Sequence, residues 1–98
     1  MPAYLMLFSY TAQGIQGIKQ SPDRIEAAKQ TVRSMGGEVR SFYGILGSAH
    51  DTMFIVEAPD DATVARMVLA ISALGNVRTE THRLFTEEEF KTVIRSLP

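Results

Sequence analysis

The 98-residue sequence has no cysteine and no tryptophan, and its charges almost cancel. Without cysteine the chain has no means to form a disulfide framework, a cysteine-bound iron–sulfur cluster or a thiol nucleophile. Ten Lys and Arg residues against eleven Asp and Glu residues give a net charge of −1, so the composition does not suggest binding to nucleic acid. No apolar run approaches the ~20 residues that a membrane-spanning helix needs.

What remains is the composition of an ordinary globular protein. The chain is 45% hydrophobic and 21% charged, and a chain of 98 residues is long enough to bury a modest core. The first residues, Met1 to Phe8, lack the basic start and the cleavage site of a secretory signal. We therefore expect residues 1–98 to form a single cytoplasmic domain with no membrane partner.

Four segments have the pattern of β-strands. Residues 3–10 and 52–58 are apolar on both faces, which is typical of strands in the middle of a sheet. Residues 38–45 and 77–85 alternate between apolar and polar side chains, which is typical of half-exposed strands. The sequence thus predicts two central strands and two edge strands.

Two longer helices are predicted between these strands. The first begins at Ser21-Pro22-Asp23, where we expect Ser21 to be the N-cap, and ends at Gly36-Gly37. The second opens at Pro59-Asp60-Asp61 and ends at Gly75-Asn76. Apolar residues at helical spacing predict the buried stripe of this second helix: Val64, Ala65, Val68, Leu69 and Ile71.

A short final helix follows the last strand. Thr86 and Glu89 are spaced as a capping box, in which each side chain binds the backbone N–H of the other. The helix has an apolar face made of Phe90, Val93, Ile94 and Leu97.

The order of the elements is βαββαβ followed by this short helix. It predicts an α+β, ferredoxin-like fold with an antiparallel four-stranded sheet. Right-handed crossovers place the first and third strands in the centre and the second and fourth at the edges. The residue patterns agree with this placement, because the two doubly apolar segments are those assigned to the centre.

The sequence also predicts an uncovered apolar face. Both long helices pack on one side of the sheet, yet the central strands are apolar on both sides. Either Tyr4, Met6 and Phe8 or Leu5 and Leu7 must therefore face away from the helices. Soluble monomers rarely expose so large an apolar patch, which favours a homodimer that pairs sheet to sheet as a dimeric α/β barrel. The alternative is that the short C-terminal helix folds back over this face.

Two groups of polar residues are candidates for chemistry. His50-Asp51 ends the turn between the second and third strands, where an imidazole can exchange protons near neutral pH. The alternatives are a solvated turn histidine and an aspartate that accepts backbone N–H groups to close the turn. Arg78, Glu80 and His82 share one face of the last strand, where they can bind a ligand or only keep a sheet edge soluble.

Aromatic residues give a further candidate. Tyr43, with Tyr4, Tyr10 and Phe42, can line an apolar pocket between sheets, or these residues can serve packing alone. Strict alternation predicts that Val39 shares its side of the strand with Ser41 and Tyr43. The candidate ligand-binding residues are Tyr43, His50, Asp51, Arg78, Glu80 and His82.

Metal and cofactor motifs are missing. With His50 and His82 as the only histidines, a zinc site would depend on carboxylates, and we expect neither a metal nor a cofactor. Gly14-Ile15-Gln16-Gly17 matches the GxxG of some nucleic-acid-binding loops but lacks flanking basic residues.

Several stretches resemble the GYD-domain family of small bacterial proteins. They are Leu46-Gly47 with His50-Asp51, then residues 56–61, and then residues 74–81. The family is named for a glycine–tyrosine–aspartate turn. Gly47 and Asp51 match that turn, while His50 stands where tyrosine is expected. The resemblance implies a ferredoxin-like, dimeric α/β-barrel architecture and brings no assigned catalytic residues.

The last strand, Val77-Arg78-Thr79-Glu80-Thr81, is also similar to that of the effector-binding domains of Lrp/AsnC regulators. That resemblance implies a small metabolite bound between subunits.

Three functions therefore stay open. The first is a homodimeric module that binds a small molecule between the sheet face and the subunit interface. The second is a cofactor-free isomerase or monooxygenase with His50 or His82 as acid–base group. The third is a structural or interaction dimer without a pocket.

Overall fold

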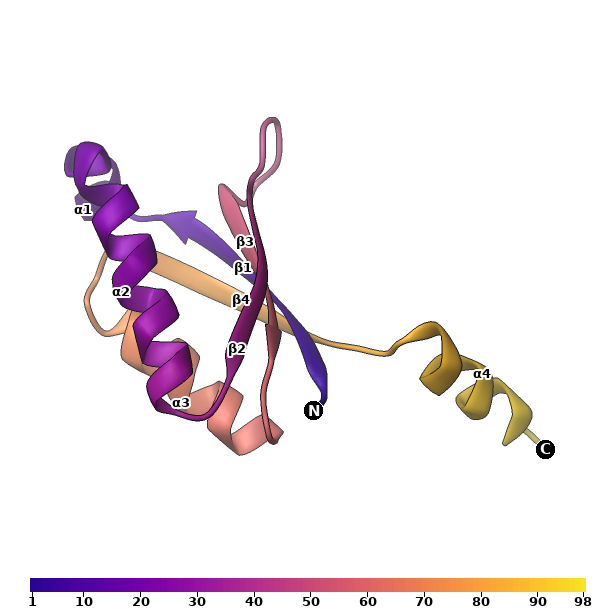
Figure 1. Cartoon of the computed structure of the whole chain (residues 1–98). Helices are drawn as coiled ribbons and strands as arrows, with labels where there is room; N and C mark the ends of the chain where they lie inside the picture. Colours follow the sequence, from indigo (N-terminus) through magenta and orange to yellow (C-terminus); the bar gives the residue numbers. More distant parts are fainter.

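The computed structural model describes residues 1–98 and contains a four-stranded antiparallel sheet with two long helices on one face (Figure 1). The strands are β1 (Ala3–Tyr10), β2 (Glu38–Gly44), β3 (Thr52–Glu57) and β4 (Val77–Leu84). The helical segments are α1 (Ala12–Gln16), the 3-10 turn η1 (Ile18–Gln20), α2 (Ser21–Ser34), α3 (Asp61–Ser72) and α4 (Glu87–Arg95). The strand order β2-β3-β1-β4 confirms the predicted central and edge strands.

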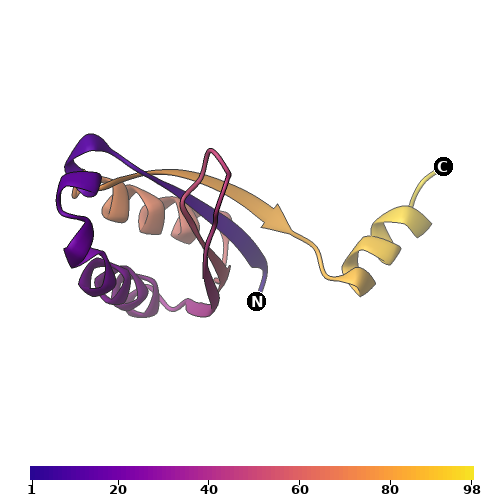
Figure 2. The same ribbon diagram turned by 90° about the horizontal axis from the view of Figure 1, so that it is seen from above.

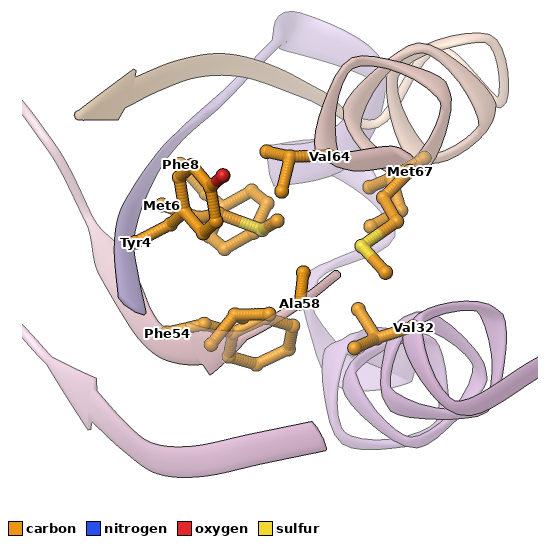
Figure 3. Packing of buried hydrophobic residues seen from close by; sticks show 10 residues of the cluster. Tyr4, Met6, Phe8, Val32, Phe54, Ala58, Val64 and Met67 are labelled. Atoms are coloured by element: carbon orange, nitrogen blue, oxygen red, sulfur yellow. The ribbon is translucent and has the colours of Figure 1, made fainter. Parts of the chain in front are cut away.

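The central strand β1 divides its side chains between two environments. Tyr4, Met6 and Phe8 point toward α2 and α3 and are only 3%, 0% and 5% exposed (Figure 3). Leu5 and Leu7 alternate with them and therefore lie on the opposite face of the sheet. The structure thus settles which residues of β1 form the face without helices.

The core lies between the sheet and the helices α2 and α3. Val32 of α2 and Met67 of α3 are completely buried there. The predicted stripe of α3 is partly wrong, because Leu69 is 68% exposed and Ala65 is also exposed. Positions 64, 67 and 71 follow the i, i+3, i+7 spacing of one helix face, so Met67 takes the place that the prediction gave to Leu69.

A β-bulge in β2 overturns the predicted alternation of that strand. Val39 pairs with Val56, and the next residue in register is Ser41, which pairs with Ile55. The extra residue, Arg40, reverses the alternation that follows it. Val39 therefore packs with the core, while Ser41 and Tyr43 lie on the opposite face of the sheet.

The two long helices begin differently. Asp60 is the N-cap of α3, as the sequence predicts, and its carboxylate accepts from the backbone N–H of Thr63 at 2.8 Å. The predicted N-cap of α2 is wrong, because η1 runs directly into the helix and Ser21 already lies within it. The Ser21 Oγ instead lies 2.8 Å from the Tyr10 hydroxyl and joins the helix to β1.

The C-terminal helix α4 extends away from the rest of the chain (Figure 2). Its predicted capping box is present, with Glu89 N–H to Thr86 Oγ1 at 3.1 Å and Thr86 N–H to the Glu89 carboxylate at 2.8 Å. An ion pair of 3.4 Å between Arg83 and Glu89 fixes the start of α4 to β4. The alternative in which this helix folds back over the sheet is therefore wrong, and its apolar residues are exposed.

Candidate functional site

The sheet face opposite α2 and α3 has an apolar centre. Leu5 pairs in register with Ile55, and Leu7 pairs with Met53, so the four side chains form one block on two neighbouring strands. All four are half-buried, and neither long helix nor α4 covers them (Figures 1 and 2). We call this block of Leu5, Leu7, Met53 and Ile55 the open apolar face.

A polar border lies along one side of the open apolar face. Strand β4 pairs with β1 so that Glu80 lies beside Leu7, and His82 lies beside Leu5. Arg78 pairs with Ser9 in the same register. Registered pairs in an antiparallel sheet share a face, so the predicted row of charged residues is on the same side as the open apolar face.

His50 joins this border from the loop between β2 and β3. Its Nε2 atom lies 3.7 Å from Oε1 of Glu80, and Nε2 of His82 lies 2.7 Å from Oε2 of the same carboxylate. One carboxylate thus lies between two imidazoles that are 32 positions apart in the sequence (His50 and His82). We call these three residues the His50–Glu80–His82 cluster.

The orientation of His50 is set by Ser9. The Ser9 hydroxyl has one hydrogen, which it donates to the carbonyl oxygen of Ala49 at 3.0 Å. Ser9 Oγ also lies 3.1 Å from Nδ1 of His50, and therefore accepts a hydrogen bond from the Nδ1–H group. This arrangement turns Nε2 of His50 toward Glu80.

The surroundings of Glu80 favour its charged form. The hydrogen bond with His82, followed by the nearby charges of His50 and His82, lowers the pKa of the Glu80 carboxyl. The cluster therefore presents a carboxylate acceptor flanked by two imidazoles that can donate or accept protons. Such a group can bind a polar molecule through hydrogen bonds or take part in proton transfer.

The other predicted site residues lie outside the cluster. The Asp51 carboxylate accepts from the backbone N–H of Tyr10 at 2.9 Å, and the Asp51 N–H donates to the Phe8 carbonyl at 2.8 Å. Asp51 thus joins the turn to β1. This confirms the alternative in which the aspartate accepts a backbone N–H group and closes the turn. Tyr43 is 63% exposed at the far edge of the same face, beside Met53, and Arg78 is exposed without an ion-pair partner.

Ser9 is not among the residues that the sequence pattern predicts for the site. It ends an almost continuous apolar run, and its polar character looks like that of a strand end. The available signal was its position two residues after Leu7 on the same face, which makes it the polar continuation of the open apolar face.

Two pockets lie elsewhere in the molecule. An apolar cavity of about 100 Å³ lies under α2, lined among others by Ile25, Phe42 and Leu74. A groove of about 350 Å³ between α3 and β4 includes Asp61 and Arg83. Neither is lined by a histidine. The chain has no group of three or more His, Asp or Glu side chains arranged to hold a metal ion, and no helix long and apolar enough to cross a membrane.

Solved structures share the fold at low sequence identity. The leucine response regulatory protein LrpA of Mycobacterium tuberculosis superposes with a TM-score of 0.64 at 16% identity, over 87% of this chain and 51% of that one. The feast or famine regulatory protein of M. tuberculosis, solved with L-methionine, gives 0.66 at 16% identity, over 88% and 51%. The chain thus spans about half the length of these regulators. Together they show a shared small α/β fold.

The chain also has a relative at higher sequence identity. A Thermus thermophilus protein named "Glutamine synthetase and cystathionine beta-lyase binding protein" is 37% identical over 82 residues, which is 83% of this chain and 85% of that protein. The family model of the GYD domain matches residues 4–94. This match covers almost the whole length, and the chain belongs to the GYD-domain family.

Proposed function

We propose that this GYD-domain protein is a homodimeric binding module that holds a small polar molecule at the edge of its subunit interface. The observation that carries this proposal is the open apolar face bordered by the His50–Glu80–His82 cluster. The apolar centre supplies a surface whose burial drives pairing. The polar border then lies at the rim of that interface, where it can bind a ligand between two copies.

Binding stands ahead of catalysis for a geometric reason. Glu80 and His82 are about half exposed, at 51% and 53% of their side-chain area, and neither main cavity of the chain includes them. Enzymes usually exclude water around the groups that transfer protons. A ligand held at an interface rim needs hydrogen-bonding groups but not a closed chamber.

The dimer is tested by light scattering on the wild type and two variants. We expect the wild type to have twice the monomer mass of 10.8 kDa. Leu7→Arg places a charge in the open apolar face and should give a monomer. Leu69→Arg makes the same change on the exposed side of α3 and should leave the dimer intact. A monomeric wild type at low micromolar concentration contradicts the proposal.

The ligand site is tested by thermal-shift screening of small polar metabolites. A compound that binds the cluster should raise the melting temperature of the wild type, because ligand binding to the folded state stabilises it. The same compound should have little effect on Glu80→Gln. Glu26→Gln makes the same change on the exposed side of α2, away from the polar border, and serves as the matched control. Equal stabilisation of the wild type and Glu80→Gln would place the ligand elsewhere.

A second candidate function is the capture of a metabolic enzyme. The relative from T. thermophilus is named for binding glutamine synthetase and cystathionine beta-lyase. In this chain α4 offers a protein-binding surface, since Phe90, Ile94 and Leu97 are 53%, 51% and 63% exposed on one helix face. Amphipathic helices bind proteins by placing such a face in an apolar groove.

Enzyme capture is tested by surface plasmon resonance with both purified enzymes from the organism that encodes this chain. Ile94→Asp lies on the apolar face of α4 and should abolish binding. Thr92→Asp adds the same charge away from that face and should preserve it. Failure of the wild type to bind either enzyme removes this candidate and leaves the dimer proposal unaffected.

A further inference from the structure

The groove between α3 and β4 lies on the opposite side of the sheet from the His50–Glu80–His82 cluster. Thr81 and Arg83 of β4 pair in register with Met6 and Tyr4, whose side chains face the helices. The volume of the groove, about 350 Å³, falls within the range of ~300–1,000 Å³ typical of small-molecule sites. A sheet-to-sheet dimer would leave this groove open.

One end of the groove carries an acceptor with negative charge. The buried Tyr4 hydroxyl donates to Oδ1 of Asp61 at 2.5 Å. Burial, followed by the hydrogen bond and the charge of Asp61, raises the pKa of Tyr4 to about 12, so the proton stays on the tyrosine. In Figure 3 the Tyr4 hydroxyl points to the side of α3 that carries Val64. Asp61 itself is exposed, and its second oxygen, Oδ2, accepts no hydrogen bond from the protein.

The groove also contains a cation. The Arg83 guanidinium lies 5.7 Å from the centre of the Tyr4 ring, and its side chain is 30% exposed. Its Nη1 donates to the carbonyls of Leu84 and Ala3, and its Nη2 donates to Glu89. Because a guanidinium has five N–H groups, Nε–H and one N–H of Nη2 remain without a protein acceptor. Arg83 forms no ion pair with Asp61, so two opposite charges face one groove separately.

Thr81 supplies an independent sign of a ligand. Its Oγ1 atom is buried and has no hydrogen-bond partner, and it is the one side-chain atom of the molecule in this condition. Buried hydroxyls nearly always have a partner, because leaving one unpaired costs free energy. Thr81 lines the same groove as Asp61 and Arg83, so a bound molecule can supply the missing partner.

We propose that the α3–β4 groove binds a small zwitterion of the aliphatic α-amino-acid class. The ammonium group binds Oδ2 of Asp61, and the carboxylate binds the free N–H groups of Arg83, with the Thr81 hydroxyl as a further partner. The aliphatic side chain packs on the apolar wall formed by Val64 and Val68 of α3. Opposite charges in one groove select a molecule that carries both charges over a simple amine or a simple acid.

The first experiment is calorimetric titration of the wild type with L-leucine. Two half-ligands serve as comparisons: 3-methylbutylamine, which lacks the carboxylate, and 4-methylpentanoate, which lacks the ammonium group. We expect L-leucine to bind and each half-ligand to bind at least about tenfold more weakly, because each half-ligand loses one of the two charge-assisted contacts. No heat of binding with L-leucine at millimolar concentration overturns the proposal.

Variants locate the site. Asp61→Asn keeps the acceptor for Tyr4 but removes the charge, and should weaken L-leucine binding by about tenfold or more. Asp23→Asn makes the same change in the first turn of α2 and should leave the affinity unchanged. Thr81→Val removes the unpaired hydroxyl, so it should weaken binding while the melting temperature of the free protein stays equal or rises. Equal affinity in wild type and Asp61→Asn overturns the inference.

A last variant separates this site from the one at the proposed dimer edge. His82→Ala should leave L-leucine affinity unchanged, because His82 lies on the opposite sheet face. If L-leucine binding depends on His82 and not on Asp61, the amino acid belongs to the dimer edge, and the groove inference is wrong. If the protein is monomeric and L-leucine binding still depends on Asp61, the groove inference holds and the proposed dimer does not.

Discussion

The two faces of the sheet are built from the same strands but differ in how deeply their side chains are buried. Toward the helices, Met6 and Phe54 are 0% and 2% exposed. On the other face, Leu5 and Leu7 alternate with these core residues along the same sheet and remain half-buried. A strand that is apolar on both sides needs both of its faces buried. In this chain the helices α2 and α3 bury one face of the sheet, and no element of the chain buries the other.

The largest expected effect comes from truncating the helix-side core. Phe54 packs edge-on against Phe8 and Phe42, with ring centres at 5.1 and 6.0 Å. Phe54→Ala should lower the free energy of unfolding by about 3–5 kcal/mol, measured by urea denaturation at low protein concentration. Tyr43→Ala on the open side should cost less than about 1 kcal/mol under the same conditions. Equal losses would mean that both faces are covered alike.

A smaller effect is expected from the partly buried hydrogen bond between Tyr4 and Asp61 on the helix side. Tyr4→Phe removes the hydrogen bond to Asp61 and should lower the free energy of unfolding by about 1–3 kcal/mol at neutral pH. The pKa of Tyr4 is raised from 10.0 to about 12 in the folded protein, so its contribution is fully present below pH 10.0 and lost as pH rises toward 12. The wild type should therefore lose stability over this alkaline range more steeply than Tyr4→Phe. Parallel curves would contradict this assignment.

The polar contact on the open side should act at the other end of the pH scale. The pKa of Glu80 is lowered from its usual 4.5, so its contribution is present above pH 4.5 and lost as pH falls through the lower, folded-state value. Glu80→Gln should flatten the acid side of the stability curve, measured as the urea midpoint at a series of pH values. The effect should be smaller than that of Tyr4→Phe, because exposed charge pairs contribute little. An acid slope identical to that of the wild type would contradict the role given to His82.

The smallest effect on global stability is expected in α4. Thr86→Ala removes half of the capping box and should reduce the far-UV signal of the helix. The global unfolding midpoint should stay the same, because α4 does not pack on the core (Figure 2). A lowered midpoint would show that α4 covers the open apolar face in solution.

The element order and the central strands could be predicted because hydrophobic periodicity reports directly on burial. The bulge at Arg40 could not be predicted, because no residue type in the segment 38–45 indicates an extra residue in the pairing of β2 with β3. Ser21 looks like an N-cap in sequence, yet its backbone N–H binds the carbonyl of Ile18 in the preceding η1 turn, and its hydroxyl contacts Tyr10 instead of capping the helix.

The sequence placed Glu80 and His82 together, since residues two apart in a strand share a face. Whether His50 lies near Glu80 depends on how β1, β3 and the β2–β3 loop are positioned. The spacing of residues within one strand gives no information on those positions. The α3–β4 groove was missed for the same reason, because Tyr4 and Asp61 are 57 positions apart in the sequence. Sites assembled across distant strands become visible only once the register is known.

The position of β1 also decides when this protein is able to fold. Strand β1 leaves the ribosome before both of its partners, which are β3, with Ala3 paired to Glu57, and β4, with Ala3 paired to Leu84. At synthesis rates of ~5–20 residues per second, β1 stays without its β4 neighbour for several seconds. Only the β2–β3 hairpin forms from strands adjacent in sequence. The sheet therefore closes only after β4 has been synthesised, and the doubly apolar strand β1 lacks that neighbour until then.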